Sequence, residues 1–262
     1  MPPELLDRAR LADEPDFVPA ATRDAATVAL LRDAPAGPEV YLLRRVRGMS
    51  FAGGMHVFPG GSVDPADADS DVDAASWAAA FGVPEPVARA LVCAAVRETF
   101  EESGVLLAGT TADDLLADVS TDEWEAERVA LEAREQSLSD LLARRGLVLR
   151  ADLLRPLAHW ITPDVEPKRF DTRFFVASLP AGQVCRDAGT EADTRVWIRP
   201  QDALDQGLQL MPPTVAVLQD LARFSSVAEA LAVSRTIEPV QPKFRVAPDG
   251  GLLLLMPGDP AY

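Results

Sequence analysis

Three glutamates that share one side of a predicted helix are the residues of this chain best suited to chemistry. Residues 97–105 read Arg-Glu-Thr-Phe-Glu-Glu-Ser-Gly-Val. At about 100° per residue, Glu98, Glu101 and Glu102 fall within roughly one third of the helix circumference. Carboxylates this close repel one another in water, so the pattern favours a site for divalent cations. A solvated acidic helix face is the alternative, because the whole chain is acidic.

The residues around the glutamates have the pattern of an amphipathic helix that ends at a glycine. Residues 87–95 contain neither glycine nor proline and extend the helix upstream, while Gly104 suits its left-handed terminating position. The side opposite the glutamates carries Val92, Ala95, Val96, Thr99 and Phe100. Arg97 precedes Glu101 by four residues, so we expect it to pair with a carboxylate and orient it.

A second segment has the properties of a ligand-binding turn. Residues 58–64 read Phe-Pro-Gly-Gly-Ser-Val-Asp and follow an apolar stretch. A Pro-Gly-Gly turn lets backbone carbonyls approach an ion or ligand without interference from Cβ atoms.

Together the two segments resemble the signature of the Nudix hydrolase family. Gly61 opens the signature, Asp67 takes the place of its acid, and residues 97–105 match its second half, with Thr99 at an apolar position. The chain departs from the family in two respects. Residues 68–96 make the interval 22 residues longer than in the signature, and Asp67 replaces the usual glutamate. In the family this acid mostly supports the loop, so its replacement bears on local geometry more than on catalysis.

The resemblance implies an α/β fold: an α/β/α sandwich around a mixed β-sheet. Residues 25–32 and 39–46 have the pattern of a strand hairpin with a turn at 35–38, and residues 168–176 and 194–198 that of later strands. We expect an N-terminal arm at residues 1–23 and a Nudix domain at 24–205, with insertions at about 68–88 and 112–145. A C-terminal extension, residues 206–262, is expected to pack on the same domain.

Both insertions and the C-terminal extension carry predicted elements. Short helices are predicted at residues 74–81, 122–134 and 138–145, and the second insertion is a candidate lid or homodimer contact. In the extension we expect a helix at 213–223, another beginning with a capping pattern at 226–229, and a hairpin of 243–247 with 252–256.

The resemblance also assigns roles at the site. Glu98, Glu101 and Glu102, with the carbonyl of Gly61, are expected to hold Mg²⁺ or Mn²⁺, and Arg97 to orient the glutamates. Glu98 is the first candidate for the general base, and Glu191, in the loop before the Trp197 strand, is the second. The candidate substrate-binding residues are Arg44, Arg45 and Arg173.

The implied reaction is hydrolysis of the diphosphate bond of a nucleoside diphosphate linked to another group. The interrupted signature, the Phe-Pro-Gly-Gly turn, and the segments 160–163 and 169–175 are most similar to the branch that includes coenzyme A and acyl-coenzyme A diphosphatases. The alternatives are an ADP-ribose or dinucleotide diphosphatase and a Nudix-fold sensor that binds a nucleotide without cleaving it.

Composition limits the classes of partner. With 262 residues, 48% of them hydrophobic, the chain can bury one sizeable core with attachments. A formal charge of −16 and only two lysines, Lys168 and Lys243, argue against a nucleic-acid surface. A phosphorylated small molecule is repelled as well unless cations intervene, which again indicates metal at the glutamates. Arg47, Lys168 and Arg169 add local positive charge to the candidate arginines.

Other chemistries lack the residues they need. Cys93 and Cys185 are too few for a disulfide framework, and proline precedes both lysines, which excludes a Walker A loop. His56 and His159 are too few for a histidine-rich zinc centre. The chain has neither a run of about 18 apolar residues nor a signal-peptide pattern at its start. We therefore expect a cytoplasmic protein without a membrane partner.

Overall fold

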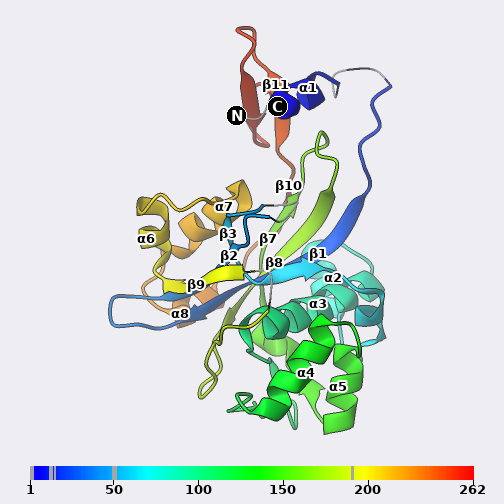
Figure 1. Cartoon of the computed structure of the whole chain (residues 1–262), viewed down its shortest axis with the longest axis vertical. Coiled ribbons are helices and arrows are strands. Elements are labelled where there is room, and N and C mark those ends of the chain that lie inside the picture. Colours follow the sequence, from blue (N-terminus) through cyan, green and yellow to red (C-terminus); the bar gives the residue numbers. More distant parts are fainter. Residues whose placement is uncertain (1–2, 12–13, 15, 49–51, 190–191) are drawn as a thin grey trace.

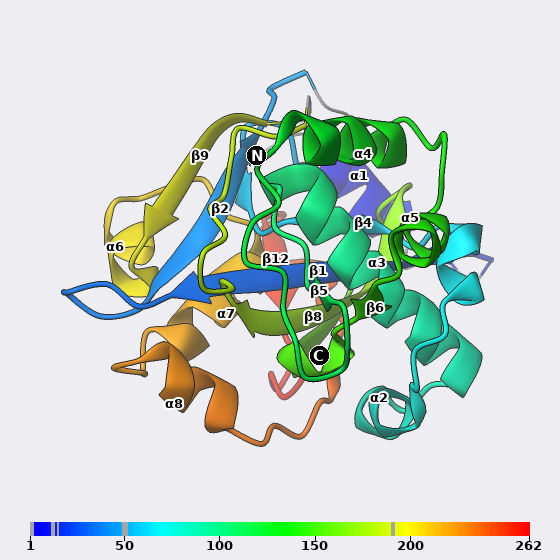
Figure 2. The ribbon, with the colours of Figure 1, turned by 90° about the horizontal axis from the view of Figure 1, so that it is seen from below.

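A mixed β-sheet forms the centre of the molecule and carries helices on both faces (Figures 1 and 2). The computed structural model describes residues 3–11, 14, 16–48, 52–189 and 192–262. Among these residues, eight strands form the sheet, in the order β10-β7-β8-β1-β2-β3, with β4 paired to β1 and β9 to β2. This is the α/β/α arrangement around a mixed sheet that the sequence predicted.

The two longest strands lie side by side and in parallel at the middle of the sheet. They are β1 (Thr22–Arg32) and β8 (Arg169–Ser178), and their register runs from Thr22 opposite Arg169 to Leu31 opposite Ser178. Both strands alternate between the two faces of the sheet. Phe175 therefore enters the core on one face, and Phe174 the core on the other.

The remaining strands complete the sheet on either side of this pair. They are β2 (Glu39–Arg45), β3 (His56–Val57), β4 (Gly60–Ser62), β7 (Arg155–Ile161), β9 (Ala192–Ile198) and β10 (Pro239–Val240). β2 runs antiparallel to β1, as predicted for the hairpin with its turn at 35–38. The short β4 pairs with β1 through Gly60 opposite Thr27 and Gly61 opposite Ala26. This pairing places the Pro-Gly-Gly segment beside the centre of the sheet, and the predicted turn is wrong at Gly60 and Gly61, which are residues of strand β4.

One face of the sheet is covered by the helix that carries the glutamates. This helix, α3 (Glu85–Ser103), ends at Gly104 in the left-handed conformation (φ 72°), as the glycine predicted. Val92, Ala95, Val96, Thr99 and Phe100 are all buried against the sheet. The apolar side of the predicted helix is therefore confirmed, and its packing fixes which way the acidic side points.

The insertion within the signature folds onto the same face. It begins with the 3₁₀ helix η1 (Pro65–Asp69), continues as α2 (Ala75–Phe81), and ends in the first turns of α3. Trp77 and Phe81 of α2 pack on Phe175 of β8, with ring centroids 5.3 and 5.2 Å apart. The extra residues therefore extend the core and leave the two halves of the signature close together.

The second insertion forms a helical layer over α3. It contains α4 (Asp122–Glu132) and α5 (Leu138–Arg145). It is flanked by the small sheet of β5 (Ala108–Gly109) and β6 (Val148–Leu149) and by the 3₁₀ helix η2 (Ala151–Leu153). The predicted helices are present, and Gly146 ends α5 as expected.

The opposite face of the sheet is covered by helices from the C-terminal part of the chain. These are α6 (Pro200–Asp205), α7 (Pro212–Leu221) and α8 (Val227–Ala232), which share a core with Phe174 and Val176 of β8. Ser226 caps α8 by accepting a hydrogen bond from the backbone N–H of Glu229 (3.2 Å). Figure 2 shows these helices and the α2–α5 layer on opposite sides of the sheet.

The two ends of the chain meet above the sheet. The predicted hairpin is present as β11 (Lys243–Val246) and β12 (Leu252–Leu255), and it packs against α1 (Pro3–Leu11) at one end of the molecule (Figure 1). The segment expected to be an N-terminal arm thus contains a helix, and the hairpin packs against that helix.

Within the described part of the chain, no single helix is long and apolar enough to cross a membrane. In the same residues, α2 and α3 taken together have the length and apolar composition of a membrane span, but the chain bends by 95° between them.

Candidate active site

The Pro-Gly-Gly segment lies against two of the three glutamates, Glu98 and Glu102. The backbone N–H of Gly60 donates a hydrogen bond to Oε2 of Glu102 (2.8 Å). A Cβ atom on Gly61 would lie 2.4 Å from Oε1 of Glu98, and one on Gly60 would lie 2.5 Å from the carbonyl oxygen of Ala26. A side chain on Gly60 would thus meet the backbone of β1, and one on Gly61 would displace the Glu98 carboxylate. The structure thus joins the two segments that the sequence singled out.

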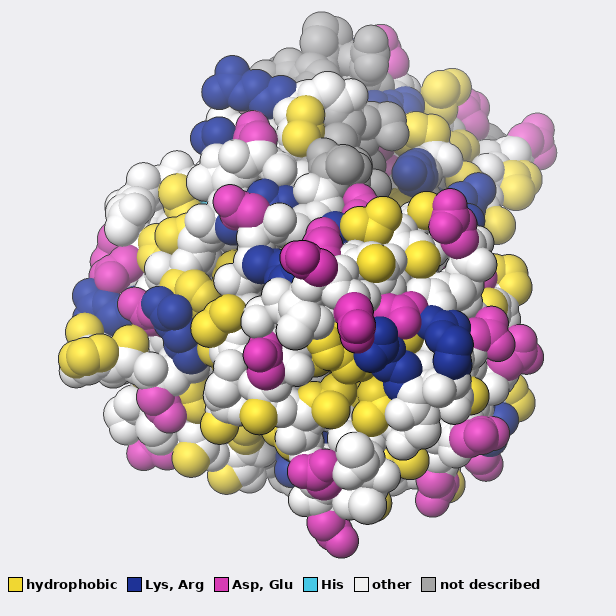
Figure 3. All heavy atoms as spheres, turned by 60° about the horizontal axis from the view of Figure 1, so that its bottom comes forward, with side chains coloured by type: hydrophobic (Ala, Val, Ile, Leu, Met, Phe, Trp, Pro, Cys, Tyr) yellow, Lys and Arg dark blue, Asp and Glu magenta, His cyan; other side chains and the backbone are white. Residues whose placement is uncertain are grey.

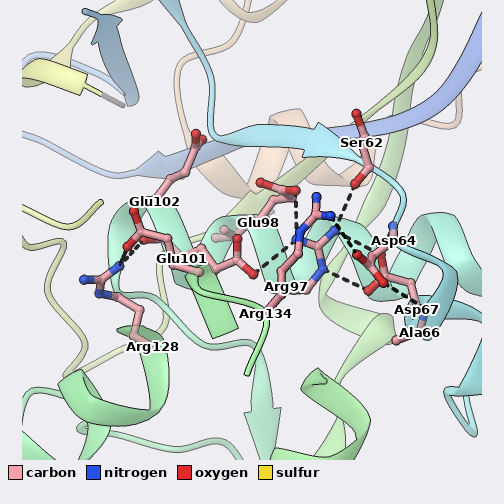
Figure 4. A network of polar contacts seen from close by, with 12 residues as sticks. Ser62, Asp64, Ala66, Asp67, Arg97, Glu98, Glu101, Glu102, Arg128 and Arg134 are labelled. Carbon is pink, nitrogen blue, oxygen red and sulfur yellow. Dashed lines mark hydrogen bonds and ion pairs between the residues drawn. The ribbon is translucent and has the colours of Figure 1, made fainter. Parts of the chain in front are cut away.

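Arg97 organises the acidic cluster, as predicted, and contacts more groups than the sequence indicated (Figure 4). Its Nη1 donates to Glu98 (2.8 Å) and Glu101 (3.1 Å), and its Nε and Nη2 donate to both oxygens of Asp67 (2.9 and 3.0 Å). Nη2 also donates to the carbonyl of Ser62 (3.0 Å). One guanidinium therefore ties α3 to β4 and to η1.

Asp67 supports the loop, which is the role expected for the signature's acid. Its side chain is 2% exposed and accepts, in addition to the Arg97 bonds, the backbone N–H of Asp64 (2.8 Å). Asp64 in turn accepts from the N–H of Ala66, which completes a capping box on η1. The shorter carboxylate thus reaches Arg97 because η1 carries it to the base of the loop.

A buried arginine that the sequence did not single out holds the end of α3. Arg128 of α4 donates from Nη1 to the carbonyl of Glu101 (2.8 Å) and to the side chain of Glu132 (2.8 Å). Its Nη2 donates to Glu125 (2.7 Å). Because Arg128 lies in the second insertion, no pattern near the signature could have identified it.

Burial of the carboxylates changes how they titrate. Removal from water raises the pKa of Glu98 to about 7, against the opposing effect of Arg97, and Glu101 adds to the rise by charge repulsion. Burial likewise raises the pKa of Glu101, again opposed by Arg97. A glutamate with such a pKa can take up a proton near neutral pH.

The carboxylate oxygens are of the kind that Mg²⁺ and Mn²⁺ prefer. In the described residues, however, the side chains do not stand as a converged group of three or more ligands. Arg97 holds Glu98 and Glu101 on one side, and Glu102 points to Gly60. The residue types and the close approach of Gly61 fit a metal site.

A cavity of about 1180 Å³ opens beside the acidic cluster. All three glutamates, Arg97 and Gly61 line it. Much of its remaining wall is apolar and comes from β7, β8, the start of α7 and the β11–β12 hairpin: Trp160, Ile161, Phe170, Phe174, Met211, Pro212, Phe244 and Leu254. A cavity with one acidic corner and apolar walls suits a ligand that joins a charged group to an organic one.

The candidate substrate-binding arginines are separated from one another. Arg45 lines the cavity, whereas Arg44 is turned to Asp193 and forms an ion pair with it (2.7 Å). Arg173 lies among the residues of β8 that face α2, where it pairs with Asp171 (2.6 Å) and lines a second pocket together with His159. Alternation along β2 and β8 is the reason, because one position along a strand moves a side chain to the other face. Glu191, the second candidate base, lies outside the described residues.

Comparison with known proteins agrees with this geometry. The family model for the NUDT19 Nudix domain matches residues 73–221. The chain is 25% identical to the acyl-coenzyme A diphosphatase NUDT19 of Xenopus laevis, over 86% of this chain and 71% of that protein. It is 28% identical to the Gallus gallus protein of the same name, over 92% of this chain and 79% of the relative.

A solved structure agrees as well. A Nudix hydrolase from Alicyclobacillus acidocaldarius superposes with a TM-score of 0.70 at 30% identity, covering 83% of this chain and 98% of that one. From its fold, its acidic cluster and these matches, the chain belongs to the Nudix hydrolase family, in the branch described by the NUDT19 Nudix domain.

Proposed function

We propose that this protein is a divalent-metal-dependent diphosphatase that hydrolyses coenzyme A or acyl-coenzyme A. One observation carries the proposal: Gly60 and Gly61 lie directly against Glu102 and Glu98 in the wall of a large, partly apolar cavity. The relatives from Xenopus laevis and Gallus gallus, which match most of the chain, are named acyl-coenzyme A diphosphatases.

The acidic cluster supplies the groups that a cation-assisted hydrolysis needs. Glu98, Glu101, Glu102 and the carbonyl of Gly61 would hold Mg²⁺ or Mn²⁺, with Arg97 kept in place by Asp67 and Ser62. When bound, such a cation neutralises the diphosphate oxygens and lowers the pKa of an attacking water. Without it, the −16 charge of the chain would repel the substrate.

Glu98 is our first candidate for the general base. Its burial places the pKa near 7, so its carboxylate can accept a proton from water at neutral pH. The water oxygen forms a bond to one phosphorus while the bridging oxygen leaves with the other phosphate. For coenzyme A the products are 4′-phosphopantetheine and adenosine 3′,5′-bisphosphate. Glu191 remains the second candidate for this role.

Product analysis tests the proposal. Coenzyme A, acyl-coenzyme A esters, ADP-ribose, NADH and dinucleoside polyphosphates are incubated with the protein and Mg²⁺ or Mn²⁺. We expect 4′-phosphopantetheine or its acyl form as the main product. Release of AMP from ADP-ribose or a dinucleotide, with coenzyme A left intact, would reject the substrate assignment. Binding of the whole panel without turnover would instead indicate a sensor.

A matched pair of variants connects turnover to the cluster. Glu102→Gln should lower metal-dependent kcat by at least about 100-fold, because it removes a charged oxygen from the cation site. Glu135→Gln is the control, since Glu135 is exposed and lies outside the cavity lining. Turnover at the wild-type rate in the Glu102 variant would reject the metal assignment.

A further inference from the structure

The cavity carries two basic side chains away from the glutamates. Arg23 of β1 and Lys168, directly before β8, both line it, and both side chains are exposed to solvent. Within the described part of the chain, neither forms an ion pair with a carboxylate. In a protein with 41 acidic and 25 basic residues, two cations without acidic partners inside a cavity call for a ligand of opposite charge.

The acidic residues close to these cations are paired with other arginines. The ion pairs are Glu166 with Arg8 (2.8 Å), Asp164 with Arg169 (2.6 Å) and Asp24 with Arg173 (3.3 Å). Each of these carboxylates thus lies within ion-pair distance of an arginine other than Arg23, and Glu166 lines the same cavity as Arg23 and Lys168.

Strand pairing places both cations next to Phe170 along the sheet. Arg23 lies opposite Phe170 in the parallel register of β1 and β8. Lys168 precedes Phe170 by two residues, and its ammonium nitrogen lies 5.4 Å from the centroid of the Phe170 ring. Phe170 also lines the cavity. A site with two cations beside a flat apolar ring matches a phosphate next to a nucleoside.

The distance from the acidic cluster separates this site from the diphosphate. Gly61 pairs with Ala26 of β1, and Arg23 lies three residues earlier on the same strand. At about 3.3 Å per residue, the two positions on β1 are roughly 10 Å apart. Because they are an odd number of residues apart, Arg23 shares a face of the sheet with Phe170 and Phe174, whereas Ala26 faces α3, and residues of both faces line the cavity. Lys168 lies farther along, beyond the residue opposite Arg23. Such a separation suits a second phosphate that a ribose holds away from the diphosphate at Glu98 and Gly61.

We propose that Arg23 and Lys168 bind the 3′-phosphate of the coenzyme A nucleotide, with Phe170 beside the adenosine. The inference rests on the proposed function and adds a specificity site to it. ADP-ribose and NADH have no 3′-phosphate, so the two cations would select coenzyme A over these other diphosphates. The glutamates bind only the part that all of these substrates share.

Kinetics with coenzyme A and 3′-dephospho-coenzyme A isolate this one phosphate. For the wild-type protein we expect the KM for coenzyme A to be about tenfold lower than the KM for 3′-dephospho-coenzyme A. A charge-assisted hydrogen bond to the phosphate would give a difference of this size. In the double variant Arg23→Gln/Lys168→Gln the KM for coenzyme A should rise to that for 3′-dephospho-coenzyme A, so that the two values become equal. Both side chains are exposed, so the fold should tolerate the substitutions.

The chain's other lysine provides a matched control. Lys243 lies on β11 with its ammonium 3.9 Å from the centroid of the Tyr262 ring, and it does not line the cavity. Lys243→Gln should keep the full preference for coenzyme A. Equal KM values in the wild-type protein, or a preference that survives in the double variant, would overturn the assignment.

Binding to an inactive protein separates this inference from the proposed function. Calorimetry on Glu102→Gln compares adenosine 3′,5′-bisphosphate with 5′-AMP. Tighter binding of the bisphosphate, lost when Arg23 and Lys168 are also replaced, supports the 3′-phosphate site even if coenzyme A is not hydrolysed. Equal binding of the two nucleotides overturns it even if coenzyme A is hydrolysed.

Discussion

At the scale of single residues, the acidic cluster is built at a cost in stability. Glu98 is a carboxylate with 13% of its side chain exposed, and its pKa is raised from 4.5 to about 7. A raised acid pKa means that the folded state disfavours the charged form relative to the unfolded state. Ionised Glu98 therefore destabilises the apo fold, and the cation that we propose for this cluster would offset that effect.

Replacing Glu98 should stabilise the apo protein while removing activity. In EDTA at pH 8, we expect Glu98→Gln to raise the free energy of unfolding by about 2 kcal/mol, because the amide carries no charge and can still accept from Arg97. The gain is complete above about pH 7 and fades as pH falls towards 4.5, where the unfolded-state carboxyl is also protonated. Thermal denaturation across this range is the measurement. A variant less stable than wild type at pH 8 would contradict the argument.

Unlike ionised Glu98, the ion pair of Asp67 and Arg97 should stabilise the fold. Removing one partner of a buried, doubly hydrogen-bonded ion pair leaves the other charge poorly compensated. We expect Asp67→Asn to lower the free energy of unfolding by about 3 kcal/mol, measured by urea denaturation. Exposed Asp69, on the same 3₁₀ helix, is the control, and Asp69→Asn should leave the denaturation midpoint unchanged. A similar midpoint in both variants would show that the pair does not hold the loop.

At the scale of elements, β4 places two adjacent glycines against different neighbours. A Cβ on Gly60 would lie 2.5 Å from the Ala26 carbonyl and 2.7 Å from the Thr27 Cα, both of which are backbone atoms. The atoms nearest to a Cβ on Gly61 would be those of the Glu98 carboxylate, at 2.4 to 2.7 Å. The two positions should therefore respond differently to the same methyl group.

Alanine at each glycine tests this difference. Gly60→Ala should destabilise the fold by about 2 kcal/mol, because β1 and β4 must separate. Gly61→Ala should cost less stability and reduce kcat by at least about tenfold, because Glu98 is displaced. Melting temperature and metal-dependent turnover, measured on both variants, are the readouts. Full activity in Gly61→Ala would show that Glu98 does not need its present position.

At the scale of the whole molecule, the net negative charge should make the stability of the fold depend on the cations in solution. On the face in Figure 3, Asp and Glu side chains lie interspersed with Lys and Arg. The net charge of −16 makes the compact state repel itself, so salt should stabilise it by screening. A cation bound specifically at the glutamates adds a separate contribution that depends on its concentration.

Thermal shifts at constant ionic strength separate the two effects. With free Mg²⁺ at about ten times its dissociation constant, binding adds about 1.4 kcal/mol, a shift of a few degrees beyond the NaCl control. Glu102→Gln should keep the salt effect and lose the additional shift, as should wild-type protein in EDTA. An equal Mg²⁺ shift in that variant would place the bound cation elsewhere.

The sequence determined the elements and the composition of the acidic cluster. The 3.6-residue period of α3, the glycine at its end and the alternation in β1, β2 and β8 are local properties, so the predicted helix, hairpin and strands are present. The resemblance of residues 97–105 to the Nudix signature predicted the family. The spacing of the glutamates alone could not have identified it. Arg97 was predicted to orient the glutamates because the two helix positions are one turn apart.

Only the tertiary structure decided which distant residues share the cavity. A parallel pairing between β1 and β8 sets Arg23 beside Phe170, and the face of the strand sends Arg173 to the opposite side of the sheet. Arg128 reaches α3 from an insertion whose packing no local pattern describes. The physical reason is that strand register and helix docking depend on contacts between residues far apart in the chain, whereas period, capping and charge spacing act between near neighbours.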